Sequence, residues 1–399
     1  MIYNTVIIGR GLIGSAAAKY ISRSSENVAL LGPDEETTSR EKIVFASHYD
    51  QARVQRIVAK DEVTTRLNQQ SALEYASLEK ESEIKFHTTE GCLIVIPGTD
   101  ADSYLKQYKE QAGKFKVEYE IFENGADLKT FTSDFNFPFS SKAIYEPAPS
   151  GHINPRLLIK AQQKVFQKNG GHIFNNTVKD VAYENDLIKI ICLDNEVFYS
   201  KKVLLSAGSF TNFFNLLNKK VVLKLKSETT IWARVNESEV KRLSALPTLL
   251  YKIDEPEIND IYLIQPVLYP DGNYYVKMGA NIPSDIYFKD LAEVQNWFKN
   301  VSGVDNIPVL RKALQDLIPG LLIENCFEKR CIVCYTSHGK PHIGPIDDKG
   351  IYIAAGGNGY AAMSSDALGK TSASLMLENT FPEGFTSKDF EPVFENQSL

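Results

Sequence analysis

Residues 6–18 read VIIGRGLIGSAAA and carry the strongest structural signal in the chain. Val6, Ile7 and Ile8 are apolar and β-branched, which is typical of a buried parallel strand. Three spaced glycines follow at once, and a run of small residues then begins a predicted helix. In a strand–turn–helix unit the glycines permit a tight turn and close approach to a pyrophosphate, which the helix N-terminus attracts. The stretch therefore predicts a dinucleotide site formed by Gly9, Gly11, Leu12, Ile13 and Gly14, with an unliganded glycine turn as the alternative.

The next predicted strand, residues 27–31, ends without the acidic residue that usually binds a nucleotide ribose. That acid is expected about twenty residues after the glycines, where this chain has Gly32. Asp34 and Glu35 follow in a polar turn, and they can reach the ribose hydroxyls if the turn bends back. Asp34 is our candidate for this contact.

Composition and charge exclude several classes of protein. The 399 residues suffice for two domains, and 43% hydrophobic with 24% charged residues is typical of a globular protein. A net charge of -6 argues against nucleic acid as a main partner. No run of about twenty apolar residues predicts a membrane span, and the N-terminal apolar run belongs to the glycine motif rather than to a signal peptide. Five cysteines, an odd number, fit a reducing compartment, so we expect a cytoplasmic protein.

Two later stretches have the same strand-and-turn character as the first. Residues 203–209 (VLLSAGS) predict a strand that ends in a small-residue turn before a helix, and residues 351–359 (IYIAAGGNG) predict a last strand and glycine turn. Residues 223–280 are rich in strand and aromatic signals, which suits an antiparallel sheet over a small-molecule pocket. We predict an α/β protein of two interleaved domains. A discontinuous Rossmann-like domain takes residues 1–50, 150–215 and 340–399, and an antiparallel-sheet substrate domain takes residues 51–149 and 216–339.

The part of the chain between these stretches holds helical and basic patterns. Residues 62–83 and 155–168 predict helices, whereas residues 125–139 predict an aromatic-rich loop. Arg53 and Arg56 are three residues apart and would share one face of a helix. Two cations on one face can bind a carboxylate or a flavin edge, or they can form a solvated basic face.

Taken together, these stretches resemble the D-amino-acid-oxidase-like flavoproteins, and within them the monomeric sarcosine oxidase branch. The resemblance covers nearly the whole chain. It rests on the glycine motif, Ser47-His48 with Arg53 and Arg56, Gly91 to Val95, Glu146-Pro147 with Ser150-Gly151, Leu204 to Gly208, Tyr274 to Gly279, Tyr335-Thr336 and Ala354 to Gly356. It implies bound FAD and oxidation of a secondary or primary amine or amino acid. Hydride transfer to the flavin would give an imine, with O₂ reduced to H₂O₂.

The same resemblance implies roles for individual residues. Lys277 matches a lysine above the flavin, where an ammonium would stabilise the superoxide anion during O₂ reduction. Arg56 matches the arginine that pairs with the substrate carboxylate, and Arg53 matches one near the flavin ring. Tyr335 matches a pocket tyrosine, and Asn281 replaces a pocket histidine. Further cofactor contacts fall on Ser47, His48, Val178, Ala207, Gly208, Cys334, Gly356, Asn358, Gly359 and Tyr360.

The chain departs from the family pattern at two places. The family's covalent flavin cysteine precedes the Tyr-Thr pair by two residues, but here Val333 holds that place and Cys334 follows it. Neighbouring strand residues point to opposite faces, so a covalent link through Cys334 needs a one-residue shift, and a buried strand cysteine is the alternative. No second ligand pair accompanies Cys331 and Cys334, so we predict no metal site. Residues 359–364 lack the lysine that helps to hold the substrate carboxylate in the family.

Other functions remain open at this point. A dehydrogenase that passes electrons to a quinone or protein would use the same framework, as would a flavin-dependent tailoring enzyme or a non-catalytic flavin-binding protein. We expect a monomer or small homo-oligomer with a small-molecule amine or amino-acid substrate and O₂ as partners, and with no nucleic-acid or membrane partner.

Overall fold

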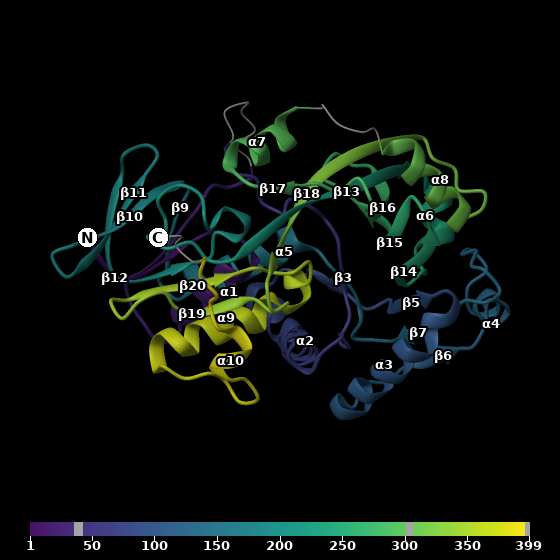
Figure 1. Ribbon diagram of the computed structural model, residues 1–399, viewed down its shortest axis with the longest axis horizontal. Helices are drawn as coiled ribbons and strands as arrows, with labels where there is room; N and C mark the ends of the chain where they lie inside the picture. Colours follow the sequence, from purple (N-terminus) through teal and green to yellow (C-terminus); the bar gives the residue numbers. More distant parts are fainter. Residues whose placement is uncertain (36–42, 301–305, 396–399) are drawn as a thin grey trace.

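The computed structural model describes residues 1–35, 43–300 and 306–395. Its strands form two large sheets, of eight and nine strands, and a small sheet of three. Figure 1 shows β10–β12 and β20 on one side of the molecule, and β13–β16 on the other. The predicted α/β fold class is confirmed.

The eight-stranded sheet is the one that the glycine motif belongs to. Its strands are β1 (Ile2–Ile8), β2 (Val28–Leu31), β9 (His172–Phe174), β10 (Val178–Glu184), β11 (Leu187–Cys192), β12 (Val197–Leu205), β19 (His342–Pro345) and β20 (Ile351–Ala355). β1 lies between β2 and β12 and is parallel to both, and β20 is parallel to β12. The chain therefore returns twice to the side of its first strand, as the apolar stretches at 203–209 and 351–359 predict.

Alternating side chains bury both faces of this sheet. Ile7, Leu30 and Leu204 pack against helices on one face. Most of that layer comes from α1 (Leu12–Ile21), α2 (Glu62–Ser82), α5 (Pro155–Lys168) and α9 (Ala361–Glu378), and Phe390 near the C-terminus joins it. Val6 and Ile8 face the other way and pack against residues of β10 and β11. Because both faces are covered, the second half of β1 is apolar at consecutive positions, which explains the VII run.

The nine-stranded sheet forms the other half of the molecule. Its strands are β5 (Cys92–Ile96), β6 (Glu120–Phe122), β7 (Lys142–Glu146), β13 (Leu223–Val235), β14 (Thr248–Glu255), β15 (Ile258–Leu268), β16 (Tyr274–Asn281), β17 (Tyr287–Phe288) and β18 (Asn325–Thr336). Val276, Met278 and Ala280 join the core on one face, which α6 (Glu237–Leu243) and α8 (Ile307–Leu317) help to form. Lys277 and Asn281 lie at alternate positions of β16, so they belong to the opposite face.

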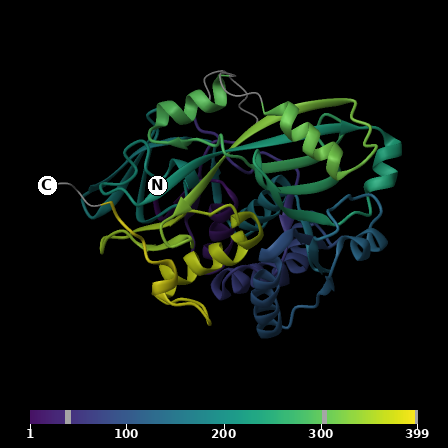
Figure 2. The ribbon, with the colours of Figure 1, turned by 45° about the vertical axis from the view of Figure 1, so that its right-hand side comes forward.

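The remaining elements connect and flank the two large sheets. They are β3 (Arg53–Gln55), β4 (His87–Thr88) and β8 (Gly151–Ile153) of the small sheet, and helices α3 (Ala101–Phe115), α4 (Gly125–Phe131), α7 (Leu291–Lys299) and α10 (Ser387–Phe390). Figure 2 shows α9 and α10 on the same side of the molecule as α2. Helix α5 begins where the sequence predicts, because the Asn154 side chain accepts a hydrogen bond from the Leu157 N–H and Pro155 fits the first turn.

Three local predictions are wrong. Arg53 lies in strand β3 and Arg56 follows it, so the two residues do not share a helix face. Residues 125–131 form helix α4 rather than a loop, because the Asn124 side chain accepts hydrogen bonds from two backbone N–H groups of its first turn. The strand at 203–209 leads into a single 3₁₀ turn, Gly208–Phe210, instead of a helix. The limits of the two domains stay a prediction.

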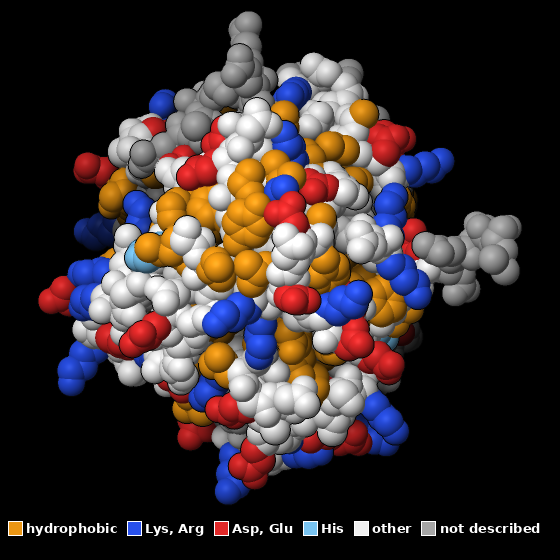
Figure 3. Space-filling model, turned by 90° about the vertical axis from the view of Figure 1, so that its left-hand side faces the viewer, with side chains coloured by type: hydrophobic (Ala, Val, Ile, Leu, Met, Phe, Trp, Pro, Cys, Tyr) orange, Lys and Arg blue, Asp and Glu red, His pale blue; other side chains and the backbone are white. Residues whose placement is uncertain are grey.

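Within the described ranges, no helix combines the length and apolar character needed to cross a membrane. Figure 3 shows one face of the molecule, on which Lys and Arg side chains alternate with Asp and Glu around small hydrophobic groups. This face therefore carries charges of both signs.

Candidate active site

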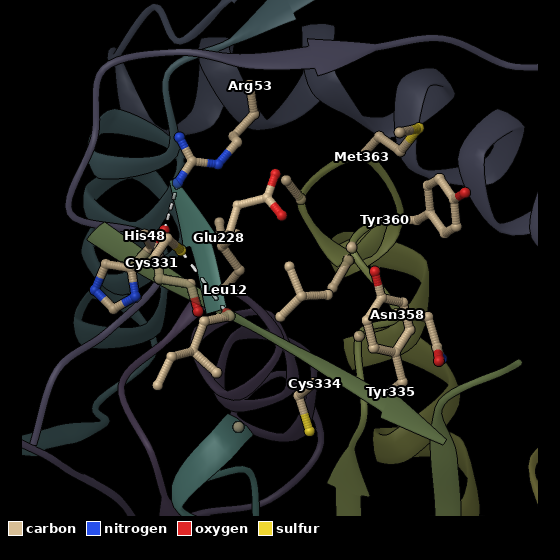
Figure 4. A pocket seen from close by; sticks show the side chains of 18 of the residues that line it. Leu12, His48, Arg53, Glu228, Cys331, Cys334, Tyr335, Asn358, Tyr360 and Met363 are labelled. Carbon is tan, nitrogen blue, oxygen red and sulfur yellow. Dashed lines mark hydrogen bonds between the residues drawn. The ribbon is translucent and has the colours of Figure 1, made fainter. Parts of the chain in front are cut away.

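A cavity of about 460 Å³ lies between the two large sheets. One side is formed by loops at the ends of parallel strands, where β1, β12 and β20 lead into the turns that follow them. The other side is formed by residues of β5, β13–β16 and β18. Figure 4 shows side chains from both sides converging on this space. Crevices at the carboxyl ends of parallel strands are where ligands of open α/β sheets bind.

The glycine loop at the end of β1 has the geometry that a pyrophosphate requires. Gly9 has a φ of +118°, and a Cβ there would overlap the Ser206 carbonyl; a Cβ on Gly14 would overlap the Gly9 carbonyl. Gly11 is different, because a Cβ there would lie 3.7 Å from His48 Nδ1 and would point towards the cavity region. Helix α1 starts at the next residue with no side-chain cap, so its first N–H groups are available to an anion. The loop fits the predicted dinucleotide.

The turn between β20 and α9 forms a second border of the cavity. Asn358 has a φ of +51°; its side chain accepts a hydrogen bond from the Thr336 N–H (2.9 Å) and donates one to the Gly356 carbonyl (2.7 Å). The turn is thereby fixed to β18. Helix α9 begins after Tyr360, again without a side-chain cap. Two uncapped helix N-termini thus border one cavity, which suits a cofactor with electron-rich groups at both ends.

The acidic residues after β2 are engaged with protein groups. Asp34 accepts a hydrogen bond from the Asn175 side chain (2.7 Å), and Glu35 forms an ion pair with Arg156. Gly32 allows Arg10 to lie close, because a Cβ at Gly32 would come within 2.8 Å of the Arg10 backbone nitrogen. Arg10 lines the cavity and Asp34 is not among the lining residues. The ribose contact of Asp34 stays a prediction.

Most predicted cofactor residues border the cavity. They are Gly11, Leu12, Ile13, Ser47, His48, Arg53, Ala207, Gly208, Cys334, Gly356, Asn358, Gly359 and Tyr360. Gly9 and Gly14 shape the loop from behind. Val178 is placed elsewhere: it lies in β10, buried in the core formed with Val6 and Val203.

The two cysteines of β18 lie on opposite faces of the strand. The pairing of β18 with β13 runs without a shift from Thr336 to Asn325, so the one-residue shift that a covalent link through Cys334 needs is not found in this strand. Cys334 packs in a cluster with Phe210 and Leu225 and also borders the cavity. Cys331 shares the face of Val333, lies opposite Glu228 and borders the cavity as well. The covalent link through Cys334 stays a prediction.

Lys277 is buried in a charged cluster directly behind the cavity wall. Its side chain is 1% exposed, and its ammonium contacts Asp50 Oδ2 (2.5 Å) and donates to the Ala52 carbonyl (3.0 Å). Arg53, which lines the cavity, also pairs with Asp50. Burial and the charge of Arg53 lower the pKa of Lys277 to about 8, although Asp50 opposes them. Burial raises the pKa of Asp50, but the charges of Arg53 and Lys277 outweigh it and hold that pKa below its usual range. Sequence reasoning missed Asp50 because its partner on β16 is remote in sequence.

Arg56 is a buried cation on the cavity wall. Its guanidinium donates to the Val58 carbonyl, its Nε has no hydrogen-bond partner, and it forms no ion pair with the residues that the structure describes. Glu146, whose charge helps to raise the pKa of Arg56, is occupied by the N–H groups of Ile57 and Val58. A buried charge normally has a partner, so Arg56 is prepared to receive an anion.

The wall formed by the antiparallel sheet is polar. Asn281 donates to Asp260 (2.5 Å) and accepts from Lys226 (2.7 Å), and Tyr335 also lines the cavity. Burial raises the pKa of Tyr335 to about 12. Glu228 faces the same space and was missed in the sequence. The signal was present, because β13 reads LKLKSETTIWARV, with charged residues at alternate positions of a buried strand.

Comparison with known proteins agrees with this geometry. The family description "FAD dependent oxidoreductase" (DAO) matches residues 4–375. N-methyl-L-tryptophan oxidase of Yersinia pestis (strain Pestoides F) is 23% identical over 211 residues, covering 52% of this chain and 54% of the relative. The match thus spans about half the length of this curated relative.

Two solved structures share the fold along their whole length. NikD, described as an unusual amino acid oxidase essential for nikkomycin biosynthesis, superposes in its open form with a TM-score of 0.79 at 16% identity, covering 100% of this chain and 99% of NikD. Glycine oxidase from Bacillus cereus ATCC 14579 superposes with a TM-score of 0.70 at 15% identity, covering 100% of this chain and 99% of the glycine oxidase. With the family match over residues 4–375, the chain belongs to the DAO family of FAD-dependent oxidoreductases.

Proposed function

We propose that this protein oxidises the carbon–nitrogen bond of an amino acid or a carboxylate-bearing amine. The observation that carries the proposal is Arg56, a buried guanidinium on the wall of the cavity beside the glycine loop, with no carboxylate partner among the described residues. A planar guanidinium binds a carboxylate through paired hydrogen bonds. The amine and amino-acid oxidases among the similar proteins support the same substrate class.

The protein's own residues bind, orient and shield the reactants. Bound FAD supplies the two-electron oxidation chemistry. The glycine loop and the start of α1 hold its phosphates, and the turn at Gly356–Tyr360 borders the other end of the cavity. Arg56 fixes the substrate carboxylate, so the α-carbon is oriented by a contact that does not react. Tyr335 and Asn281 line the space around it.

O₂ is the proposed electron acceptor, with H₂O₂ as product. Support comes from the cluster of Lys277, Arg53 and Asp50, in which two cations share one carboxylate. One positive charge in excess remains at the cavity wall, where it stabilises an anion that develops during O₂ reduction.

A dehydrogenase with a non-O₂ acceptor is the second candidate. The observation that favours it is that Lys277 is held by Asp50 and the Ala52 carbonyl, and is not itself among the cavity-lining residues. An ammonium that is partly neutralised and set back from the cavity would stabilise the anion formed during O₂ reduction less.

Anaerobic mixing of the purified holoprotein with a panel of N-methyl amino acids, cyclic imino acids and plain amines tests the proposed activity. Bleaching of the flavin by members of the carboxylate-bearing groups is expected, and no bleaching by any compound would refute it. Admitting O₂ then separates the two candidates: fast recovery of the yellow colour with H₂O₂ indicates an oxidase. Lys277→Met should slow that recovery without slowing the bleaching. An unchanged rate of colour recovery would show that Lys277 has no role in O₂ reduction.

A further inference from the structure

Glu228 is a carboxylate that faces the cavity and has no role in the function proposed above. It lies on β13 directly opposite Cys331 of β18, and its side chain is 10% exposed. Figure 4 shows its carboxylate directed into the cavity that Arg53 also borders. Burying a carboxylate away from water is costly unless a positively charged group lies beside it.

The protein compensates this carboxylate only in part. Lys226 lies 3.1 Å from Glu228, but the same ammonium contacts Asp285 at 2.6 Å and the Asn281 side chain at 2.7 Å. One cation therefore serves two carboxylates, and Asp260 adds a further negative charge to the same wall. Burial, opposed by Lys226, raises the pKa of Glu228 to about 7. Near neutral pH this group can both hold and release a proton.

The two signs of charge occupy different parts of the cavity wall. Arg53 and Arg56 come from the chain segment of β3, whereas Glu228 and Asp260 come from the large antiparallel sheet. In the part of the chain that the structure describes, neither arginine forms an ion pair with either carboxylate. An amino acid in its ordinary ionic form also carries separate charges of opposite sign, so it matches this arrangement.

We propose that Glu228 binds the positively charged nitrogen of the substrate and takes a proton from it before oxidation. The inference rests on the proposed function, because it assumes that the substrate carboxylate lies on Arg56. An alkylammonium holds its proton up to a pH of about 10 and has no free electron pair on nitrogen. In the step proposed, one N–H bond breaks, an O–H bond forms on Glu228, and nitrogen keeps the electron pair. Lys226 remains paired with Asp285, so no cation is left without a partner.

The surroundings of Glu228 determine at which pH the step operates. The charged or titratable groups that influence it, or that it influences, are Lys226, Asp285, Asp260, Cys331, Tyr262 and Tyr335. Burial raises the pKa values of Cys331, Tyr262 and Tyr335, so these three are neutral at physiological pH. Lys277, whose pKa is lowered to about 8, also titrates near neutral pH, and Glu228→Gln separates the two groups because it removes only the change that belongs to Glu228.

Glu228→Gln is the test variant, because glutamine keeps the size of the side chain and cannot accept this proton. Asp285→Asn is the matched control: it alters the same Lys226 contacts but removes no carboxylate from the cavity wall. Both variants are compared as holoproteins, with far-UV circular dichroism confirming the fold.

Binding is measured first, with two probes of nearly the same shape that cannot be oxidised at nitrogen. Trimethylammonioacetate carries a permanent cation, and 3,3-dimethylbutanoate has a neutral carbon in its place. The affinity for each is measured by isothermal titration calorimetry. Wild type and Asp285→Asn should prefer the cationic probe by about tenfold or more. Glu228→Gln should lose this preference. An equal affinity of wild type for the two probes, or a preference retained in Glu228→Gln, overturns the inference.

The pH dependence of anaerobic flavin bleaching provides the second readout. In wild type the rate should rise through pH 7, and in Asp285→Asn it should rise at lower pH, because the charge of Asp285 helps to raise the pKa of Glu228. Glu228→Gln should lose this rise and be slower by about 10²-fold at pH 7. Its rate should recover only towards pH 10, where the substrate loses its proton to water. An unchanged profile in Glu228→Gln overturns this inference while the proposed function stands. A wild type that no amino acid bleaches overturns both.

Discussion

Replacing Arg56 by glutamine removes the guanidinium proposed to hold the substrate carboxylate. Arg56 is 5% exposed, and its Nε has no partner. A bound carboxylate would accept two charge-assisted hydrogen bonds, each contributing about 1.5–3 kcal/mol. Taking about 4 kcal/mol for the pair, we expect Arg56→Gln to lower the second-order rate of flavin bleaching by about 10³-fold.

The assay compares an amino acid with the amine that lacks its carboxylate, at several concentrations and without O₂. Wild type should be bleached much faster by the amino acid than by the amine. Arg56→Gln should be bleached at nearly the same rate by both compounds. Lys60→Gln is the control, because Lys60 also lines the cavity but is exposed to solvent. The thermal unfolding temperature of Arg56→Gln should equal or exceed that of wild type, because a buried cation without a carboxylate partner stabilises the fold little. Equal slowing of both compounds by Arg56→Gln, or the same loss of preference in Lys60→Gln, would refute the reasoning.

Three further predictions concern the fold. Gly9→Ala should abolish folding, because its Cβ would overlap the Ser206 carbonyl. Gly11→Ala should fold but retain little FAD. The yield and the flavin content of the purified protein distinguish the two variants. Lys19→Ala should lower the free energy of unfolding by about 3–5 kcal/mol, since it leaves the buried carboxylate of Asp366 without its cation between α1 and α9. In the same denaturant titration, the exposed Lys370→Ala should cost less than about 1 kcal/mol. Glu228→Gln should stabilise the FAD-free protein above pH 7 but not below pH 4.5. The folded wild type holds its proton up to a pKa of about 7 against the ordinary 4.5, so stability is lost as pH rises between them, by about 3 kcal/mol. An advantage of the variant that is equal at pH 4 and pH 8 would contradict the assignment.

The parts of the fold that follow from the sequence are those determined by local patterns. The VII run, the glycine turn and the alanine-rich helix are consecutive, so each predicts the next, and the structure has them as β1, the loop and α1. The same holds for α5, which begins at an asparagine cap followed by proline. The return of β12 and β20 to the side of β1 was predictable because parallel buried strands are apolar throughout.

The charged groups of the cavity were harder to predict because their partners are distant in sequence. Lys277 could be identified by resemblance, but its contact with Asp50 depends on how β16 packs against the segment before β3. The sequence leaves a solvated helix face open for Arg56, and the fold shows that Arg56 is buried. Glu228 was missed, and its position across from Cys331 depends on strand register, which alternation alone does not determine.

Anaerobic flavin bleaching by amino acids tests the central claim most directly. The account predicts that the purified, yellow holoprotein loses its visible flavin absorbance when mixed with a suitable N-methyl or cyclic amino acid, and that Arg56→Gln loses the preference for the carboxylate. A holoprotein that binds FAD in full amount but is bleached by no amino acid or amine of the panel would contradict the proposed function.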